Sequence, residues 1–406
     1  MPKKFIGINV HEAAKERISY AFDNFEKICI SYSGGKDSTA MLHMVMDEAI
    51  KRKRKVYVMF IDLEAQFNLT INHLIECFDM YIDHIEPLWF CLPIQLRNAV
   101  SVFQPHWYPW AHENKQAWVR KLPKYAIHDE NYLPFFCRGI EFEEFLPEFA
   151  KWLSQGIPTA FFVGIRTGES YNRYMAIQHK TKSMFRNKCY TTGITKNSYN
   201  FYPIFDWKTE DIWIYHGKNP HKPYNKLYDL MYKAGLSIHQ QRICQPYGDD
   251  QRRGLWLYQV IEPETWGRVV ARVNGANNGA FYMMESGNVS GYRGVSKPEN
   301  HNWESFAKML VNSMPDKTKE HYENKITIFV KWWMERGYED GIPDEGDYKL
   351  EIDKKIPSWR RICKSLLRND WWCKGIGFVQ QKSAAYENYL RIMRARKEKW
   401  QMNLFN

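Results

Sequence analysis

The sequence lacks a hydrophobic run long enough to cross a membrane, because no stretch of about 18 apolar residues occurs anywhere in it. Its first six residues include two lysines but no long apolar segment and no small-residue cleavage site, which excludes a secretory signal of the usual kind. Internal repeats and low-complexity tracts are missing as well. These absences predict a cytoplasmic globular protein.

Closely spaced cysteines are also missing. None of the eight cysteines falls in a Cys-x-x-Cys pair; they are Cys29, Cys77, Cys91, Cys137, Cys189, Cys244, Cys363 and Cys373. Zinc ribbons and iron–sulfur frameworks need such pairs, whereas cysteines inside apolar runs pack as small hydrophobic residues. We therefore expect reduced thiols, no zinc and no iron–sulfur cluster.

Aromatic and positively charged residues, in contrast, are plentiful. The 406 residues include 16 Trp, 25 Tyr and 23 Phe, and 57 Lys and Arg against 46 Asp and Glu give a net charge of +11. Rings that stack on bases and cations that attract phosphates would suit DNA or RNA. Aromatic cores and a mild charge spread over a large surface explain the same composition. Composition alone leaves both explanations open.

Hydrophobic patterning predicts an α/β fold in the first half of the chain. An amphipathic helix over 10–27 precedes an apolar run at 28–32, a helical stretch at 39–50 and a second apolar run at 56–61. The order strand, loop, helix, strand predicts a doubly wound, mainly parallel sheet whose ligands bind at the carboxyl ends of its strands. Further strands are expected at 88–92 and 159–165.

Two other regions depart from this pattern. Residues 100–137 are dense in aromatics and prolines without clear periodicity, which is typical of an elaborated loop or small insertion and suggests a lid. Beyond residue 256, a Gly/Asn-rich patch leads to helical stretches over 302–337 and a basic helix near 384–401. We expect two domains, at 1–255 and 256–406, of which the second is mainly helical.

The strongest motif lies in the turn after the first predicted strand. Its residues are Ser33, Gly34, Gly35, Lys36, Asp37 and Ser38. At background frequencies of about 6% per residue, six specified residues would arise by chance somewhere in a chain of this length with odds of roughly 10⁻⁵. Backbone N–H groups at the start of a helix bind anions, and glycines allow close approach to them. The lysine adds charge, the serines donate hydrogen bonds, and Asp37 could bind magnesium or fix the loop.

This loop differs from the Gly-x-x-x-x-Gly-Lys-Ser/Thr motif of other NTPases, because its glycines directly precede the lysine. It resembles the PP-loop ATP pyrophosphatase superfamily. The resemblance implies that the loop holds the β,γ-pyrophosphate of ATP and that AMP is transferred to an oxygen of an acceptor. It also implies that 1–255 is a nucleotide-binding domain.

Three further stretches resemble the branch of phosphoadenosine phosphosulfate (PAPS) reductase and the small subunit of ATP sulfurylase. In that branch an aspartate like Asp62 lies near the nucleoside, and a segment like 164–173 binds the substrate; Gly164, Arg166 and Arg173 would contribute to it. Residues 203–213 and 223–228 match two more stretches of the branch. The tryptophans at 207 and 213 are also explained by packing around a helix start capped by Asp206.

The chain departs from a working PAPS reductase. That enzyme carries its thiol near the C-terminus in a Glu-Cys-Gly-x-His arrangement, whereas this sequence ends in residues 400–406 without a cysteine. We therefore do not expect PAPS reduction. Residues 238–253 retain a single cysteine, Cys244, and the block resembles IbrA-type proteins, a prophage-linked family described as co-activators of gene expression.

The 238–253 block offers several polar groups. Asp249 and Asp250 could bind a metal, and three arginines could grip phosphate: Arg242, Arg252 and Arg253. Cys244 could attack an activated substrate if the arginines stabilised its thiolate. An ordinary charged helix start with a buried cysteine explains the same residues.

Two functional hypotheses follow. In the first, an enzyme binds ATP, or a sulfonucleotide, with magnesium and adenylates an unknown acceptor by means of Lys36, Asp37, Arg166, Arg173 and Cys244. In the second, a nucleotide-sensing regulator contacts DNA or RNA through the basic, aromatic C-terminal domain, where cations alternate with large rings over 357–374. A protein partner is possible in either case.

Overall fold

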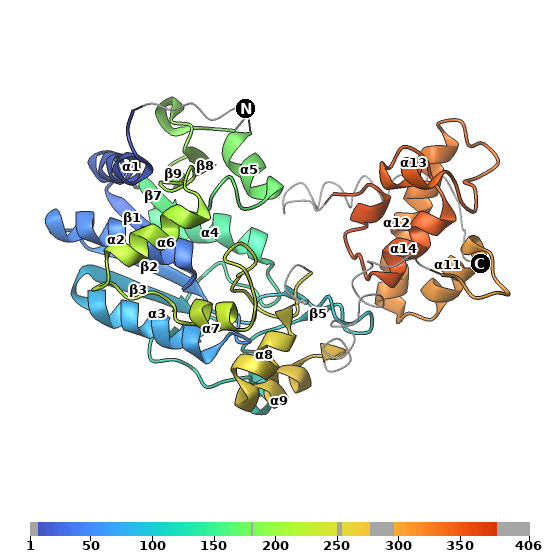
Figure 1. The fold of residues 1–406 in the computed structure, drawn as a ribbon, viewed down its shortest axis with the longest axis horizontal. Coiled ribbons are helices and arrows are strands. Elements are labelled where there is room, and N and C mark those ends of the chain that lie inside the picture. The colour runs from blue at the N-terminus through green and yellow to red at the C-terminus, as the bar shows by residue number, and fades with distance from the viewer. Residues whose placement is uncertain (1–6, 180–181, 250–253, 277–295, 380–406) are drawn as a thin grey trace. The chain divides into compact units, whose positions relative to one another are not determined.

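The computed structural model describes residues 7–179, 182–249, 254–276 and 296–379, coloured in Figure 1. Contacts divide the chain into two units. The first takes its residues from Met1–Ile94, Tyr108–Gln245 and Val260–Pro263, and the second from Gln95–Trp107, Pro246–Gln259 and Glu264–Asn406. The expected insertion at 100–137 is therefore shared between the two units. The domain limits 1–255 and 256–406 stay a prediction.

A seven-stranded sheet forms the centre of the first unit, as far as the described residues extend (Figure 1). The strand order is β6-β3-β2-β1-β7-β9-β8, and neighbours are parallel except β8, which runs antiparallel to β9. The strands are β1 (Lys27–Ser31), β2 (Val56–Ile61), β3 (Ile85–Phe90), β6 (Ala126–Ile127), β7 (Thr159–Val163), β8 (Thr191–Thr195) and β9 (Ser198–Phe201).

Helices cover both faces of this sheet. Successive residues of a strand point to opposite faces, and Phe161 of β7 packs against Phe149 of α4 while Phe162 packs against Phe22 of α1. The helices of the unit are α1 (Val10–Asn24), α2 (Lys36–Lys51), α3 (Asn68–Tyr81), α4 (Phe142–Ser154), α5 (Tyr171–Gln178), α6 (Thr209–Lys218) and α7 (Leu227–Lys233), with 3-10 turns η1 (Ile82–His84), η2 (His112–Ala117) and η3 (Phe185–Asn187).

The predicted fold class is confirmed. The strand expected at 56–61 has those bounds, and those expected at 28–32, 88–92 and 159–165 are shifted by a few residues. The sheet order runs outward from β1 in both directions, through β2 and β3 on one side and β7 on the other, which places the change of direction between β1 and β7. In doubly wound sheets, ligands bind in the crevice at this point.

The second unit contains a short antiparallel pair and a group of helices. Strands β4 (Leu96–Arg97) and β5 (His106–Trp107) form the pair. Buried side chains of α11, α12 and α14 make a core that includes Trp303, Tyr322 and Trp359. The helices here are α8 (Trp256–Ile261), through which the division between units passes, α9 (Pro263–Arg272), α11 (Trp303–Asn312), α12 (Asp316–Met334), α13 (Tyr348–Ile352), α14 (Trp359–Leu367) and the turn η5 (Lys374–Ile376).

The prediction of a mainly helical C-terminal region is confirmed. The basic helix expected near 384–401 lies outside the described residues. Among the helices that the structure describes, none has the length and apolar character that a membrane span requires.

A candidate nucleotide site at the carboxyl ends of β1 and β7

The phosphate loop joins β1 to α2 through two glycines with distinct roles. Gly34 adopts φ +70°, a conformation that favours glycine, and a β-carbon there would lie 3.1 Å from side-chain carbons of Thr70 and Leu74. Gly35 is the N-cap of α2, so the helix begins at Lys36. Ser33 and Ser38 are joined across the loop by a hydroxyl–hydroxyl contact of 2.9 Å. The first turn of a 16-residue helix thus faces the crevice with its positive dipole end.

A third glycine allows the loop after β7 to touch this turn. A β-carbon on Gly164 would lie 2.8 Å from the Cα of Ser38 and 3.1 Å from its backbone nitrogen. Atoms do not approach so closely without a backbone shift, so only glycine fits here. This close approach delivers Arg166, two residues later, to the start of α2.

Lys36, Asp37 and Arg166 form the charged centre of the site. The Nε of Arg166 donates to Oδ1 of Asp37, and Nζ of Lys36 lies 3.2 Å from Oδ2 of the same carboxylate. All three residues are at most 9% exposed. Two cations share one carboxylate, so the buried centre carries a net positive charge, which suits an anion.

The loop backbone is held from behind by side chains of α6, α7 and the segment between them. The hydroxyl of Tyr228 accepts from the Lys36 N–H at 3.1 Å, and Nε2 of His216 donates to the Lys36 carbonyl at 3.0 Å. Asn225 donates through Nδ2 to the carbonyl of Gly34 and to Thr70 Oγ1, both at 3.0 Å. Burial lowers the pKa of His216 and raises that of Tyr228, which favours the neutral form of each side chain.

Sequence reasoning assigned no role to these supporting residues. Asn225 and Tyr228 lie in the 223–228 stretch that matches the PAPS reductase branch, so a signal for them existed. Nothing in the sequence distinguishes His216. Trp213 contacts the rings of His216, Tyr224 and Tyr228 and so has the packing role that the alternative described.

The expectation that Asp206 caps a helix is wrong. Asp206 does not cap a helix: α6 begins at Thr209 with Lys208 as its N-cap, and the Asp206 carboxylate binds Arg17 at 2.7 and 2.8 Å. Trp207 is buried and donates to the carbonyl of Val10 at 2.9 Å, so it packs beneath α1.

Arg173 lies on α5, the helix that follows the loop carrying Arg166. Its Nη1 pairs with the carboxylate of Glu169, and its side chain is 41% exposed. Arg242 donates to the Glu169 carbonyl at 3.3 Å, which places the start of the 238–253 block beside this segment. The structure therefore brings Lys36, Asp37 and Arg166 together and gives Arg173 a different partner.

Asp62 directly follows β2 and is buried. Its Oδ2 accepts from the indole of Trp89 at 2.8 Å, and its Oδ1 accepts from the Glu64 N–H at 2.9 Å, from the indole of Trp110 at 3.2 Å and from Arg120. The indole and guanidinium donors come from β3 and from the aromatic segment after residue 108, and the Glu64 N–H comes from the turn after β2. Its expected contact with a nucleoside stays a prediction, and Trp110 and Arg120 were missed.

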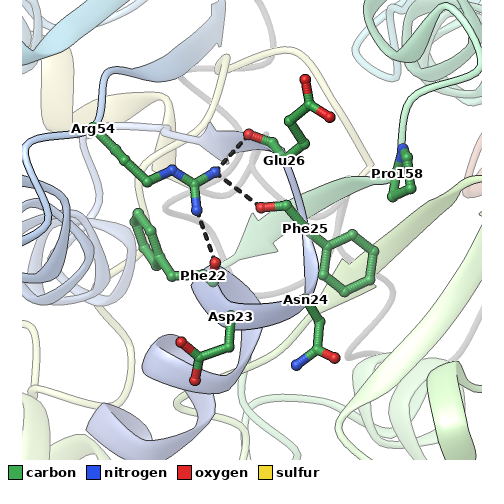
Figure 2. Close-up of a pocket in the computed structure, with 7 residues that line it drawn as sticks. All are labelled: Phe22, Asp23, Asn24, Phe25, Glu26, Arg54 and Pro158. Carbon is green, nitrogen blue, oxygen red and sulfur yellow. Dashed lines mark hydrogen bonds between the residues drawn. The ribbon is translucent and has the colours of Figure 1, made fainter.

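A pocket lies at the opposite edge of the sheet, beside the amino ends of β1, β2 and β7. Its lining residues are none of the candidate site residues. Figure 2 shows Arg54 between the ends of α1 and β2, where its guanidinium donates to the carbonyls of Phe22, Phe25 and Glu26 at 2.8, 2.9 and 2.5 Å. Arg54 thus satisfies carbonyls at the C-terminal end of α1, and we assign the pocket no ligand.

Comparison with known proteins agrees with this geometry. The model of the phosphoadenosine phosphosulfate reductase domain matches residues 27–234, more than half of the chain. The chain belongs to this family. A domain of unknown function, DUF3440, matches residues 235–345 and 338–387. The PAPS reductase domain thus contains the loop, Asp62, Gly164, Arg166 and Arg173, and membership of this family supports nucleotide binding by this part of the chain.

Two relatives of this chain, one over nearly its whole length and one over about half of it, are named as uncharacterized proteins. The protein YbdN of Escherichia coli K12 is 43% identical over 396 residues, which cover 97% of this chain and 96% of YbdN. The protein MJ0066 of Methanocaldococcus jannaschii is 26% identical over 53% of this chain and 37% of its own. The PAPS reductase of Candida auris aligns with 60% of this chain and 98% of its own at 13% identity and a TM-score of 0.30, a weak likeness. The IbrA resemblance stays a prediction.

Several predicted residues lie beyond the PAPS reductase domain. Cys244 is exposed, which contradicts the buried cysteine of the alternative reading, and Asp249 belongs to the second unit. Asp250, Arg252 and Arg253 lie outside the described residues. Within the part of the chain that the structure describes, no three His, Cys, Asp or Glu side chains gather as metal ligands. Both oxygens of Asp37 face cations, an arrangement that does not suit a magnesium ligand.

Proposed function

We propose that the PAPS reductase domain of this protein binds ATP at the loop 33–38 and transfers AMP to an acceptor, with release of pyrophosphate. The buried centre of Lys36, Asp37 and Arg166 carries this proposal. Among the residues that the structure describes, Asp37 is the one carboxylate paired with these two cations at the start of α2, so a polyphosphate supplies the missing negative charge. Family membership supports the choice of an adenine nucleotide, ATP or a sulfonucleotide.

In the proposed reaction an acceptor oxygen attacks the α-phosphorus. The bond between the α-phosphorus and the bridging oxygen breaks, pyrophosphate leaves with the electron pair, and the proton of the acceptor goes to solvent. Lys36 and Arg166 stabilise the charge that develops on the leaving group, and the loop aligns it for displacement. The supports Asn225, Tyr228 and His216 keep the loop backbone preorganised.

Arg173 and Cys244 enter this proposal as secondary groups. Arg173 would act as an anion clamp by exchanging its partner Glu169 for a phosphate, since both interactions use the same guanidinium donors. Cys244 is exposed and two residues from Arg242, so a thiolate there has access to an adenylated substrate.

The test uses ATP labelled at the α-phosphate. We expect wild-type protein to yield labelled AMP, free or on an acceptor, together with pyrophosphate, and Lys36→Ala to lose at least a hundredfold in rate. Lys55→Ala, which removes an exposed lysine at the amino end of β2, is the matched control and should behave as wild type. Labelled ADP as the product, or full activity in Lys36→Ala, would contradict the proposal.

The C-terminal residues that the structure describes give less support to nucleic-acid binding than the composition of the whole chain does. Residues 296–379 carry fifteen Lys and Arg against fourteen Asp and Glu, and three of the tryptophans, Trp303, Trp359 and Trp371, are buried. An exposed ring with a cation over it occurs at Trp332, where Arg336 lies 4.0 Å from the ring centroid. The basic residues of 391–399 lie outside the described residues, so binding of DNA or RNA stays a prediction.

A further inference from the structure

The two cations of the phosphate loop are closed off from solvent. The side chains of Lys36 and Arg166 are only 7% and 5% exposed. A polyphosphate carries several charged oxygens and cannot reach both cations until part of the surrounding structure has moved. Residues of β1 and α2 belong to the core of the unit, so a loop must make this movement.

Residues 237–245, which we call the strap, lie against Lys36. They follow α7 and run to Gln245, where the chain passes into the second unit; these nine described residues form turns but no helix or strand. Nζ of Lys36 donates to the backbone carbonyl of Gln241 at 3.5 Å, and Gln241 is 2% exposed. The strap thus covers the ammonium that a phosphate would bind and offers it an uncharged acceptor.

Tyr228 connects the strap to the phosphate loop. Its backbone carbonyl accepts from Nε2 of Gln241 at 3.2 Å, and the same amide donates to the carbonyl of Leu236 at 3.4 Å. The hydroxyl of Tyr228 accepts from the Lys36 N–H, and its ring lies 5.1 Å from the Lys36 ammonium. The side-chain amide of Gln241 therefore holds the strap in the position that brings its own carbonyl to Lys36.

The contacts that hold the strap closed are long. Arg242 donates to the carbonyl of Glu169 at 3.3 Å, and the contacts of Gln241 measure 3.2, 3.4 and 3.5 Å, whereas N–H···O bonds are commonest at about 2.9–3.0 Å. Oε1 of Gln241 is also buried without a hydrogen-bond partner among the described residues. Water would satisfy this oxygen in an open strap, so its burial opposes closure. Closure of the strap is therefore a contact that a stronger ligand can replace.

We propose that the strap closes the phosphate site of the free protein and leaves Lys36 when a polyphosphate binds. This inference rests on the proposed function, because it takes the loop 33–38 to be a phosphate site. An ionised phosphate oxygen binds an ammonium more strongly than an uncharged carbonyl does, so it displaces the carbonyl of Gln241. Only molecules with an open strap bind the anion, so the strap lowers the apparent affinity of the protein. Because the DUF3440 match begins at residue 235, occupancy of the loop changes the conformation at the start of that region.

The first experiment loosens the strap. Gln241→Ala removes the amide that donates to Tyr228 and Leu236, and it keeps the cations that would contact phosphate. We expect its dissociation constant for inorganic tripolyphosphate, measured by calorimetry on the full chain, to be at least threefold lower than that of wild type. Gln259→Ala, at an exposed glutamine of α8, is the matched control and should bind as wild type does. Unchanged or weaker binding by Gln241→Ala, or an equal gain in Gln259→Ala, overturns the strap.

A second measurement needs no variant. Trypsin cleaves after Arg242 when the strap is released, because proteolysis acts on a locally opened chain. We expect saturating tripolyphosphate to speed this cleavage at least fivefold in wild type, as followed by mass spectrometry. Cleavage after Arg138, whose side chain is 44% exposed, should keep its rate and serves as the control for trypsin itself.

The two measurements separate failure of the strap from failure of the site. Cleavage after Arg242 that stays unchanged or slows, while calorimetry shows that tripolyphosphate is bound, overturns release of the strap. Wild type that binds no tripolyphosphate overturns the proposed function itself, since the loop is then not a phosphate site.

Discussion

Gly164 and Ser38 approach so closely that no side chain fits between them: a β-carbon on Gly164 would lie 2.8 Å from the Cα of Ser38. This contact fixes the loop after β7 against the start of α2. It is the reason why Arg166 reaches Asp37, 129 residues earlier in the chain.

Gly164→Ala should therefore separate the two loops. We expect the free energy of unfolding to fall by about 1–3 kcal/mol, since backbone atoms must move to admit the methyl group. ATP affinity should fall as well, because Arg166 shifts away from Asp37. Chemical denaturation and calorimetry measure both effects. Gly168→Ala is the control, because a β-carbon there meets no atom within 4 Å and its φ is not positive; similar losses in both variants would contradict the argument.

Tyr228→Phe tests the support behind the loop. The change keeps the ring and removes the hydroxyl that accepts from the Lys36 N–H. One such hydrogen bond contributes about 0.5–1.5 kcal/mol, so ATP should bind about 3- to 10-fold more weakly. Tyr232→Phe removes a hydroxyl from an exposed residue of the same helix and should have no effect. Tighter binding by Tyr228→Phe would mean that the hydroxyl competes with phosphate for this N–H.

His43 should make stability depend on pH. Its Nδ1 contacts the Tyr81 hydroxyl and its Nε2 the carbonyl of Pro223, both at 2.8 Å, and burial lowers its pKa to about 3. In the unfolded chain the pKa returns to about 6.5. Below that value the unfolded state binds a proton that the folded state does not, so the stability present above pH 6.5 is lost as pH falls toward 3.

The slope is the measurable quantity. A single group of this kind contributes about 1.4 kcal/mol per pH unit between these two pKa values. We expect the free energy of unfolding, measured in urea at pH 7, 6 and 5, to fall with pH in wild type and to fall less steeply in His43→Gln. His112→Gln, at an exposed histidine, should keep the wild-type slope. An unchanged slope in His43→Gln would show that His43 gains no proton on unfolding.

Asn369 should stabilise the second unit. Its φ is positive, at 49°, its Nδ2 donates to the carbonyls of Ala99 and Ser101 at 3.1 and 3.0 Å, and its Oδ1 accepts from Arg97 at 2.9 Å. Asn369→Ala removes these three hydrogen bonds, so we expect a loss of about 2–4 kcal/mol. Asn312→Ala, at an exposed asparagine, should cost less than about 0.5 kcal/mol. Comparable losses would contradict this role.

Features encoded by neighbouring residues were predictable from the sequence. The runs that form β1 and β2 and the glycines between them lie within 35 residues, and local hydrophobicity and turn chemistry determine them. The supports of the site depend on distant pairs instead. Tyr228 is 192 residues from Lys36, and Arg120 is 58 residues from Asp62. Such residues become buried and paired only when the sheet brings its strand ends together. No pattern in a single sequence indicates these long-range contacts.

The assignment of residues 95–107 to the second unit has a consequence for how this protein can be divided. The PAPS reductase domain match is continuous over 27–234, yet the loop between β4 and β5 within it bonds to Asn369, about 270 residues later. A truncation near residue 260 would remove Asn369 and also Arg272, whose guanidinium lies over the ring of Trp107. During synthesis the pair emerges from the ribosome long before those partners, so the second unit cannot complete its core until almost the whole chain has been made.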